Sequence, residues 1–448
     1  MKTYIRVIQT ELIHLLRSPF KTASILLFVI AIFFGCQNGY QLFKTHNKQI
    51  LSISSKNTNS VEDMLLTYEG IESGTLEKPR RDPTIPYWAI WNVPSHAFKH
   101  PSPMMAYSLG QSEQYGYYKR VTNWSTTYDS DLAEEIANPE RLAIGTLDFN
   151  FVFTYLSPIL IIILLFNIGG LEKDLKFDNL IYSSKIAKEG WILARFLFYY
   201  LFVIALIFIL TIPYALLAGV FENHTLQYVN FLLLILLYLI LWFTIFYFIS
   251  LTGKGSSDQA LKMISVWMLL CIIIPGTIHQ ITSLKYPTNY MIDHLDVSRE
   301  LSNNIFNLPE DDLKKGLLEE YPFLQNTLHA SDTSTNAAIV NRSVSGLINS
   351  LNKNVSISIE FSSKKKNKFI KRFSKLNPVT TFQNEMNAIA ETDYYAYKNY
   401  REQIQETIDK KIELILMDTW NEVVVGKQKY IQYVKNLNKI GGCYIVLF

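Results

Sequence analysis

Five long apolar blocks, separated by polar stretches, set the pattern of this 448-residue chain. The second block, Phe151 to Gly170, has no ionisable side chain, and a helix of about 20 such residues can cross the hydrocarbon core of a bilayer. The third block, Phe196 to Val220, is also uncharged and contains Pro213, which a membrane helix tolerates when neighbouring groups satisfy the freed carbonyl. The pattern therefore predicts a mainly α-helical, polytopic membrane protein with about five transmembrane helices.

The polar stretches predict the topology. The loop between the second and third blocks is short and carries several Lys and Arg residues, which keeps such loops in the cytoplasm. The N-terminus is then cytoplasmic, and the two long polar stretches lie outside as mostly helical domains. The predicted segments are a surface helix (1–21), a first transmembrane helix (22–40), a first extracytoplasmic domain (41–147), a second transmembrane helix (148–170), a cytoplasmic coupling loop (171–195), a third transmembrane helix (196–220), a fourth (228–251), a cytoplasmic loop (252–262), a fifth (263–280) and a second extracytoplasmic domain (281–448).

The first 17 residues have the pattern of an amphipathic helix lying on the inner membrane surface. Gly35-Cys36, further on, resembles a lipoprotein cleavage site, but the bulky Phe34 before it argues against lipidation. In the N-terminal helix, the apolar positions at helical spacing are Ile5, Ile8, Leu12, Leu15 and Leu16, and the charged residues Lys2, Arg6, Glu11 and Arg17 fall largely on other faces.

Composition changes this picture little. The chain is 49% hydrophobic and 18% charged, with a net charge of +3, so its polar parts are large enough for folded domains. The basic residues form no nucleic-acid motif, and nucleic acid is not expected as a partner. The spacing of the three cysteines suggests neither a disulfide framework nor a metal site with thiolate ligands. His96 and His100 stand four apart, but Pro94 and Pro101 flank them, which favours a loop over a metal site.

No catalytic motif is evident. Gly253-Lys254-Gly255-Ser256 lacks the earlier glycine and the Ser/Thr after lysine that a phosphate-binding loop needs. Crossings two to five carry no Asp, Glu, Lys or Arg in their apolar cores, whereas ion-coupled carriers and channels usually keep such groups at depth. If the protein moves a substrate, the energy should come from outside this chain.

Two features near the C-terminal end remain open. The basic run Lys364 to Lys368, with Lys371 and Arg372, is more readily explained as a solvated face than as a site for anionic lipid or a polyanion. The chain ends in an apolar tail, Cys443 to Phe448, that is too short to span a bilayer. A sixth crossing would be expected to return the chain to the cytoplasm, and its absence suggests a truncated end.

Several short motifs, in order along nearly the whole chain, resemble those of one protein family. They are Glu11 with Leu15-Leu-Arg17-Ser-Pro19, then Pro103-Met-Met-Ala-Tyr-Ser-Leu-Gly110-Gln111 with Tyr115 and Tyr118, then Asp148-Phe149 through Tyr155-Leu-Ser-Pro158 to Phe166-Asn167 and Glu172, then Lys285-Tyr-Pro287, Asn377-Pro378 and Ala390-Glu-Thr392-Asp393. On these residues the chain resembles the ABC-2-type transporter permeases, bacterial proteins with two large outer domains and no ATPase of their own. The family's usual Glu-Arg-Glu-x-Gly-Thr loop is here Glu172-Lys-Asp-Leu-Lys-Phe177.

The resemblance implies a multi-pass permease of the bacterial plasma membrane that acts as an exporter rather than an importer. It would bind no cofactor itself, because ATP would be hydrolysed by a cytosolic ABC ATPase; its other partners would be a second permease copy or paralogue and membrane lipid. The alternatives are a membrane-anchored surface protein whose outer domains bind a partner, and a membrane enzyme acting at the outer surface. By the resemblance, the residues that receive the ATPase are Glu172, Lys173, Asp174, Lys176, Lys185 and Lys188.

Overall fold

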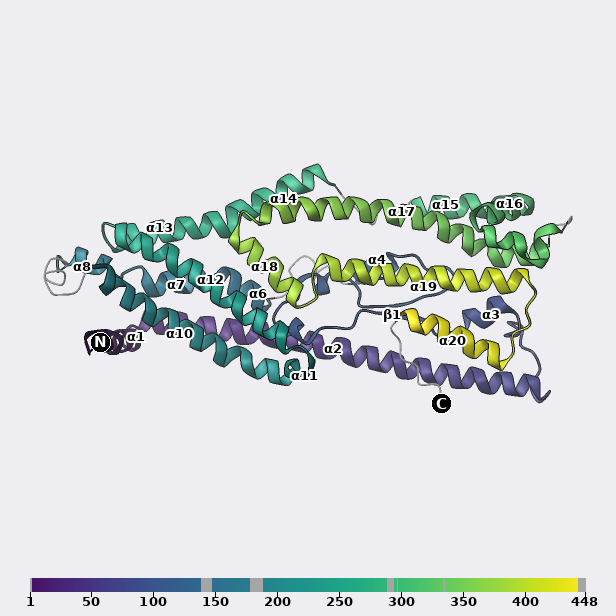
Figure 1. Ribbon diagram of the computed structural model, residues 1–448, viewed down its shortest axis with the longest axis horizontal. Coiled ribbons are helices and arrows are strands. Elements are labelled where there is room, and N and C mark those ends of the chain that lie inside the picture. Colours follow the sequence, from purple (N-terminus) through teal and green to yellow (C-terminus); the bar gives the residue numbers. More distant parts are fainter. Residues whose placement is uncertain are drawn as a thin grey trace.

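The computed structural model describes residues 2–137, 147–177, 188–287, 294–295, 297–332 and 336–441. Figure 1 shows an elongated molecule, in which a bundle of long helices occupies one end and a largely helical domain extends from it. One helix, α2 (Pro19–Glu72), runs through both parts. Its 54 residues make it about 80 Å long at the usual rise per residue.

Five helical segments within the described ranges are long and apolar enough to cross a membrane. This confirms the prediction of a helical membrane protein with five such segments. Two of them contain a short π-helical turn, η3 (Val152–Leu156) and η4 (Leu269–Ile273). The five segments are α2; Phe149–Asp174, made of α6 (Phe149–Phe151), η3, α7 (Ser157–Leu165) and α8 (Gly170–Asp174); α10 (Lys188–Leu217); α12 (Thr225–Thr252); and Ser256–Lys285, made of α13 (Ser256–Met268), η4 and α14 (Ile274–Lys285).

The helix ends differ from the predicted boundaries. The N-terminal helix α1 (Lys2–Arg17) stops at Ser18, whose extended backbone and following proline begin α2. The first crossing does not end near residue 40, because α2 continues without a break to Glu72. Residues 188–195, assigned above to the coupling loop, form the first turns of α10. Most of the predicted loop 252–262 likewise belongs to α13.

The two polar stretches, predicted as separate domains, pack together. One hydrophobic core joins Ala97 and Val121 to residues of the C-terminal half such as Ile412, and a second joins Tyr68 to Tyr430. The elements of this domain are α3 (Pro86–Trp91), β1 (His96–Phe98), η1 (Pro103–Ala106), η2 (Gly110–Glu113), β2 (Tyr118–Arg120), α4 (Asp129–Ala137), α15 (Val297–Phe306), α16 (Glu310–Glu320), η6 (Pro322–Asn326), η7 (Leu328–Ser331), α17 (Ala337–Ser374), α18 (Pro378–Ile389), α19 (Tyr394–Trp420) and α20 (Lys427–Gly441). Strands β1 and β2 pair in antiparallel register, with Ala97 opposite Lys119.

Helix α18 leaves the domain and returns to the helix bundle, where it packs on α12 (Figure 1). The ring of Phe382 stacks on that of Tyr238 with 4.2 Å between the centroids. At the start of α18, the Asn377 side chain caps the helix through the Val379 amide and donates to the Leu270 carbonyl in the fifth span. The C-terminal part of the domain is therefore anchored within the bundle.

One buried lysine in the domain predicts a pH dependence of stability. Lys411 is 1% exposed and donates to the Ser95 hydroxyl and the Val121 carbonyl. Burial, and next the nearby Arg120, lower the pKa of Lys411 from 10.5 to about 7. The unfolded chain therefore binds more protons between these two values, and stability should rise as the pH increases from 7 toward 10.5.

Replacing Lys411 with methionine should reduce that rise. The check is the midpoint of thermal unfolding of the purified protein, compared between pH 7 and about pH 9.5. Lys410→Met is the matched control, since Lys410 is partly exposed and pairs with Glu413. An equal rise with pH in the wild type and the Lys411 variant would contradict the assignment.

Candidate functional site

The described start of the predicted coupling loop, residues 171–177 with α8, lies at the end of the bundle opposite the large domain, beside α1 (Figure 1). Two adjacent glycines place it there. Gly169 has a φ of 76°, the left-handed conformation that glycine adopts without strain, and it begins α8. At Gly170, a Cβ atom would lie 2.7 Å from the Ser256 amide nitrogen. The loop therefore turns sharply and packs directly on the start of α13.

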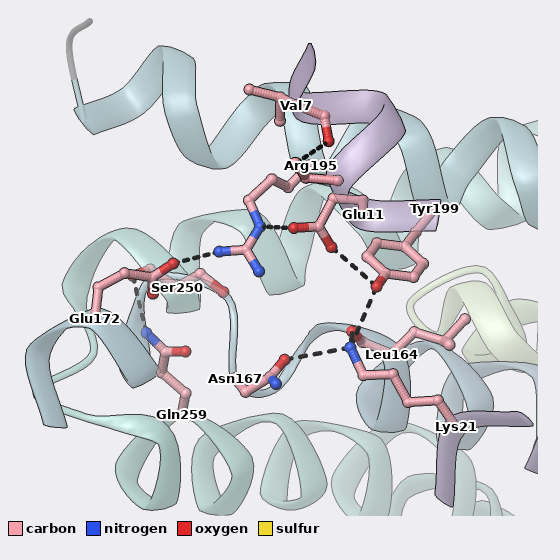
Figure 2. A network of polar contacts seen from close by, with 11 residues as sticks. Val7, Glu11, Lys21, Leu164, Asn167, Glu172, Arg195, Tyr199, Ser250 and Gln259 are labelled. Carbon is pink, nitrogen blue, oxygen red and sulfur yellow. Dashed lines mark hydrogen bonds and ion pairs between the residues drawn. The ribbon is translucent and has the colours of Figure 1, made fainter. Parts of the chain in front are cut away.

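Glu172, the first predicted coupling residue, forms an ion pair inside the protein (Figure 2). Its carboxylate contacts Nη1 of Arg195 on α10, and Nε of the same guanidinium lies 2.5 Å from Oε1 of Glu11 on α1. All three residues are largely buried. One arginine therefore holds carboxylates from the loop and from the N-terminal helix.

The network continues from Glu11 to the first span. The Tyr199 hydroxyl donates to Oε2 of Glu11 at 3.0 Å, and Lys21 Nζ donates to the Tyr199 oxygen at 3.3 Å (Figure 2). Lys21 also donates to the Leu164 carbonyl at 2.8 Å and to Oδ1 of Asn167 at 3.4 Å. The network thus joins α1, α2, α10, the end of α7 and the loop that contains α8.

The four charges of this network balance: two carboxylates face one guanidinium and one ammonium group. Buried charges are costly to desolvate, and they persist where they are paired and hydrogen-bonded. Such a network is sensitive to geometry, because moving one element leaves a charge on another without its partner. A displacement of α8 would therefore change the ion pairs that Arg195 on α10 makes with Glu172 and with Glu11 on α1.

Three other predicted coupling residues join α8 and the start of α10 to the turn between α12 and α13. Lys173 donates to the Gly253 carbonyl. Oδ2 of Asp174 accepts from the Ser256 amide at 3.0 Å, at the N-terminus of α13, where a carboxylate is favoured. Lys188 donates to the Leu251 carbonyl at 2.8 Å. This turn contains Gly253-Lys254-Gly255, and a Cβ at Gly255 would collide with the Asp174 carboxylate, so the glycine serves packing.

The exposed part of the loop has a different character. Lys176 is exposed, with a φ of 58°, and it lies among the exposed apolar side chains Leu171, Leu175 and Phe177. Lys185 lies outside the described residues. Of the five predicted coupling residues that the structure describes, four therefore make contacts within the chain, and Lys176 is left at the surface with an apolar patch. We call Leu171, Leu175, Lys176 and Phe177 the loop patch.

Sequence reasoning missed the roles of Glu11, Lys21 and Tyr199. Glu11 was predicted to lie away from the apolar stripe, but it is buried between Val7 and Leu15, each one turn away. The prediction that Leu15 shares a face with Ile8, Leu12 and Leu16 is wrong in this respect, since those three are exposed. A carboxylate in an i, i+4, i+8 series with two apolar residues was the available signal.

Comparison with known proteins adds one match. The family model described as Domain of unknown function (DUF3526) matches residues 292–433, which span α15 to the first half of α20 and so cover most of the C-terminal part of the large domain. No curated protein and no solved structure matches the chain. The part of the chain similar to a known family is thus a domain to which no function is attached.

Proposed function

We propose that this protein is the membrane-spanning subunit of an ABC transporter, an exporter permease driven by a separate cytosolic ATPase. The observation that carries the proposal is the buried charge network of Glu11, Lys21, Glu172, Arg195 and Tyr199, together with the loop patch beside it. An ATPase that moved the loop would act through Arg195 on α1 and α10 without any new contact. The resemblance of the sequence motifs to ABC-2-type permeases supports the same conclusion.

In this proposal the loop patch binds the ATPase and the charges behind it transmit the motion. Exposed apolar side chains with one cation suit a protein interface better than a free surface. Two oxygens beside the patch, Oε2 of Glu172 and Oε1 of Gln259, are buried and have no hydrogen-bond partner in the described part of the chain.

Rigid-body motion of the helices would then open a path between two permease subunits. The N-terminus and the loop would be cytoplasmic, and the large domain extracytoplasmic.

Affinity purification of the tagged protein in mild detergent, followed by mass spectrometry, tests the proposal. The wild type should recover an ABC ATPase, and the loop-patch variant Leu175→Asp with Lys176→Glu should lose it. Glu172 and Lys173 are less suitable, because their replacement disturbs contacts within the chain. The control is Leu328→Asp, which changes an exposed leucine of the large domain.

Each outcome is informative. Recovery of the ATPase by the loop-patch variant at the wild-type level would exclude this loop as the docking surface. If the wild type recovered no ATPase but only proteins that bind the large domain, the proposed transport function would be wrong. The protein would then be a membrane-anchored surface protein, whose domain has a cavity of about 320 Å³ between α17 and α19 for a ligand or partner.

A further inference from the structure

The last three turns of α17 form the most basic stretch of the chain. Between Glu360 and Glu385 there are seven Lys and Arg residues and no acidic residue. Four of the lysines fall on one side of the helix at i, i+4, i+7 and i+11 spacing, a stripe about 16 Å long. No carboxylate of a described residue lies within ion-pair distance of these four. We call Lys364, Lys368, Lys371 and Lys375 the lysine stripe.

The lysine stripe ends beside the membrane. The turn that joins α17 to α18 is held at Leu270, near the middle of the fifth span, by the hydrogen bond from Asn377. Further up, α17 runs along α14, and Lys285 at the end of that span lies 4.9 Å from the centre of the Phe369 ring (Figure 1). The stripe therefore extends from within the span to its outer end, the level at which lipid phosphates lie.

The turn itself is apolar and exposed. Leu376 is 78% exposed and Phe373 37% exposed, although both belong to a segment anchored in the bundle. Exposed apolar side chains at this depth contact acyl chains, while neighbouring lysines extend their ammonium groups to the headgroups. The combination of an apolar tip and a basic stripe matches an amphiphile with a negative head.

A small cavity opens beside the stripe, between α17, α18 and the start of α19. Its volume is about 160 Å³, and Lys371 forms part of its wall. The other lining groups include Asn367, Asn384, Glu385 and Asp393, which accept hydrogen bonds from hydroxyl groups. Oε1 of Gln111, also in the wall, is buried and has no hydrogen-bond partner within the part of the chain described. A ligand that fits has hydroxyl donors next to its negative charge.

We propose that the lysine stripe and this cavity bind an anionic phospholipid with a hydroxylated headgroup, of the phosphatidylglycerol type. The phosphate lies on the lysines, the headgroup hydroxyls donate to Gln111 and the carboxylates of the cavity, and the acyl chains pass over Leu376. Phosphate binding by lysine is electrostatic, and each lysine near an anionic membrane surface contributes about a fivefold gain in affinity. This site is separate from the loop patch and does not depend on transport.

Native mass spectrometry of the purified full-length protein, with equal amounts of phosphatidylglycerol, phosphatidylethanolamine and phosphatidate added, tests the proposal. The wild type should retain phosphatidylglycerol above the other two. Lys364→Gln with Lys368→Gln should lower its retention roughly 25-fold, as two lysines are removed. The control is Lys314→Gln with Lys315→Gln on α16, which removes the same charge from the far part of the domain. Unchanged retention in the stripe variant, or an equal loss in the control, would overturn the proposal.

Two further arms separate the parts of the site. Gln111→Leu should abolish the preference for phosphatidylglycerol over phosphatidate, which has the phosphate but no headgroup hydroxyl; a preference that persists would exclude the cavity from headgroup binding. Millimolar inorganic phosphate should leave the bound lipid in place. Displacement of the lipid by free phosphate would show a simple anion site and contradict the assignment to a phospholipid.

Discussion

Replacing Arg195 with methionine should lower the free energy of unfolding by about 3–5 kcal/mol, the cost of leaving a buried charge without its partner. Here two carboxylates, Glu11 and Glu172, would lose the same guanidinium. The loss is not one of hydrophobic packing, because methionine keeps most of the volume of the arginine stem. The measurement is the midpoint of thermal unfolding of the purified protein in detergent, monitored by the fraction of protein that remains monodisperse.

A neutral version of the network separates charge from packing. The quadruple variant Arg195→Met, Lys21→Met, Glu11→Gln, Glu172→Gln removes all four charges together and should recover most of the stability that the single variant loses. Arg299→Met on α15 is the control, since that side chain is exposed and makes no contact with the network. If the quadruple variant were as unstable as Arg195→Met, unpaired charge would not be the cause of the loss.

Replacing Gly39 with alanine is the second change with a large expected effect. Gly35 and Gly39 stand one turn apart on α2, and small residues at this spacing let another backbone approach closely. A Cβ at Gly39 would collide with the carbonyl of Ala106, and one at Gly35 would lie 2.7 Å from the Phe149 amide nitrogen. Overpacking of this kind typically lowers the free energy of unfolding by about 1–3 kcal/mol. The loss should lie toward the upper end of this range, because the obstacle is a backbone carbonyl.

The matched control for Gly39→Ala is Gly276→Ala on α14. No atom lies within 4 Å of the position that a Cβ would take at Gly276, so this change should be neutral or gain up to about 1 kcal/mol from helix propensity. The thermal midpoint should therefore fall for Gly39→Ala and stay unchanged or rise for Gly276→Ala. Equal shifts would mean that the contact between α2 and η1 does not limit stability.

The five apolar helices could be predicted from sequence because the signal for each is local. An uncharged block of sufficient length has no other stable setting than a membrane or a protein core. The end of α2 could not be predicted in the same way. Beyond residue 40 the sequence becomes polar but contains no proline, and packing against η1 and α20 keeps the helix continuous to Glu72.

The sequence singled out the loop as a candidate site but did not predict the contacts that its residues make. The family resemblance implied roles for Glu172, Lys173 and Asp174, which are consecutive residues of α8. The sequence did not show that Arg195, at the end of the predicted loop, pairs with Glu172, nor that the same guanidinium reaches Glu11 on the distant helix α1. The exposure of Lys176 among apolar neighbours could not be predicted from the sequence either, because exposure depends on which other segments pack nearby.

The sequence by itself determined that this protein is helical, that five segments can span a membrane, and that the polar remainder is large enough to fold. Each of these follows from the cost of placing polar groups in hydrocarbon, which composition and length alone express. Only the tertiary structure decided that the two polar stretches form one domain, that α18 returns to the bundle, and which buried charges neutralise each other. Pairing and packing between distant segments depend on where the chain places them, and no local pattern records that.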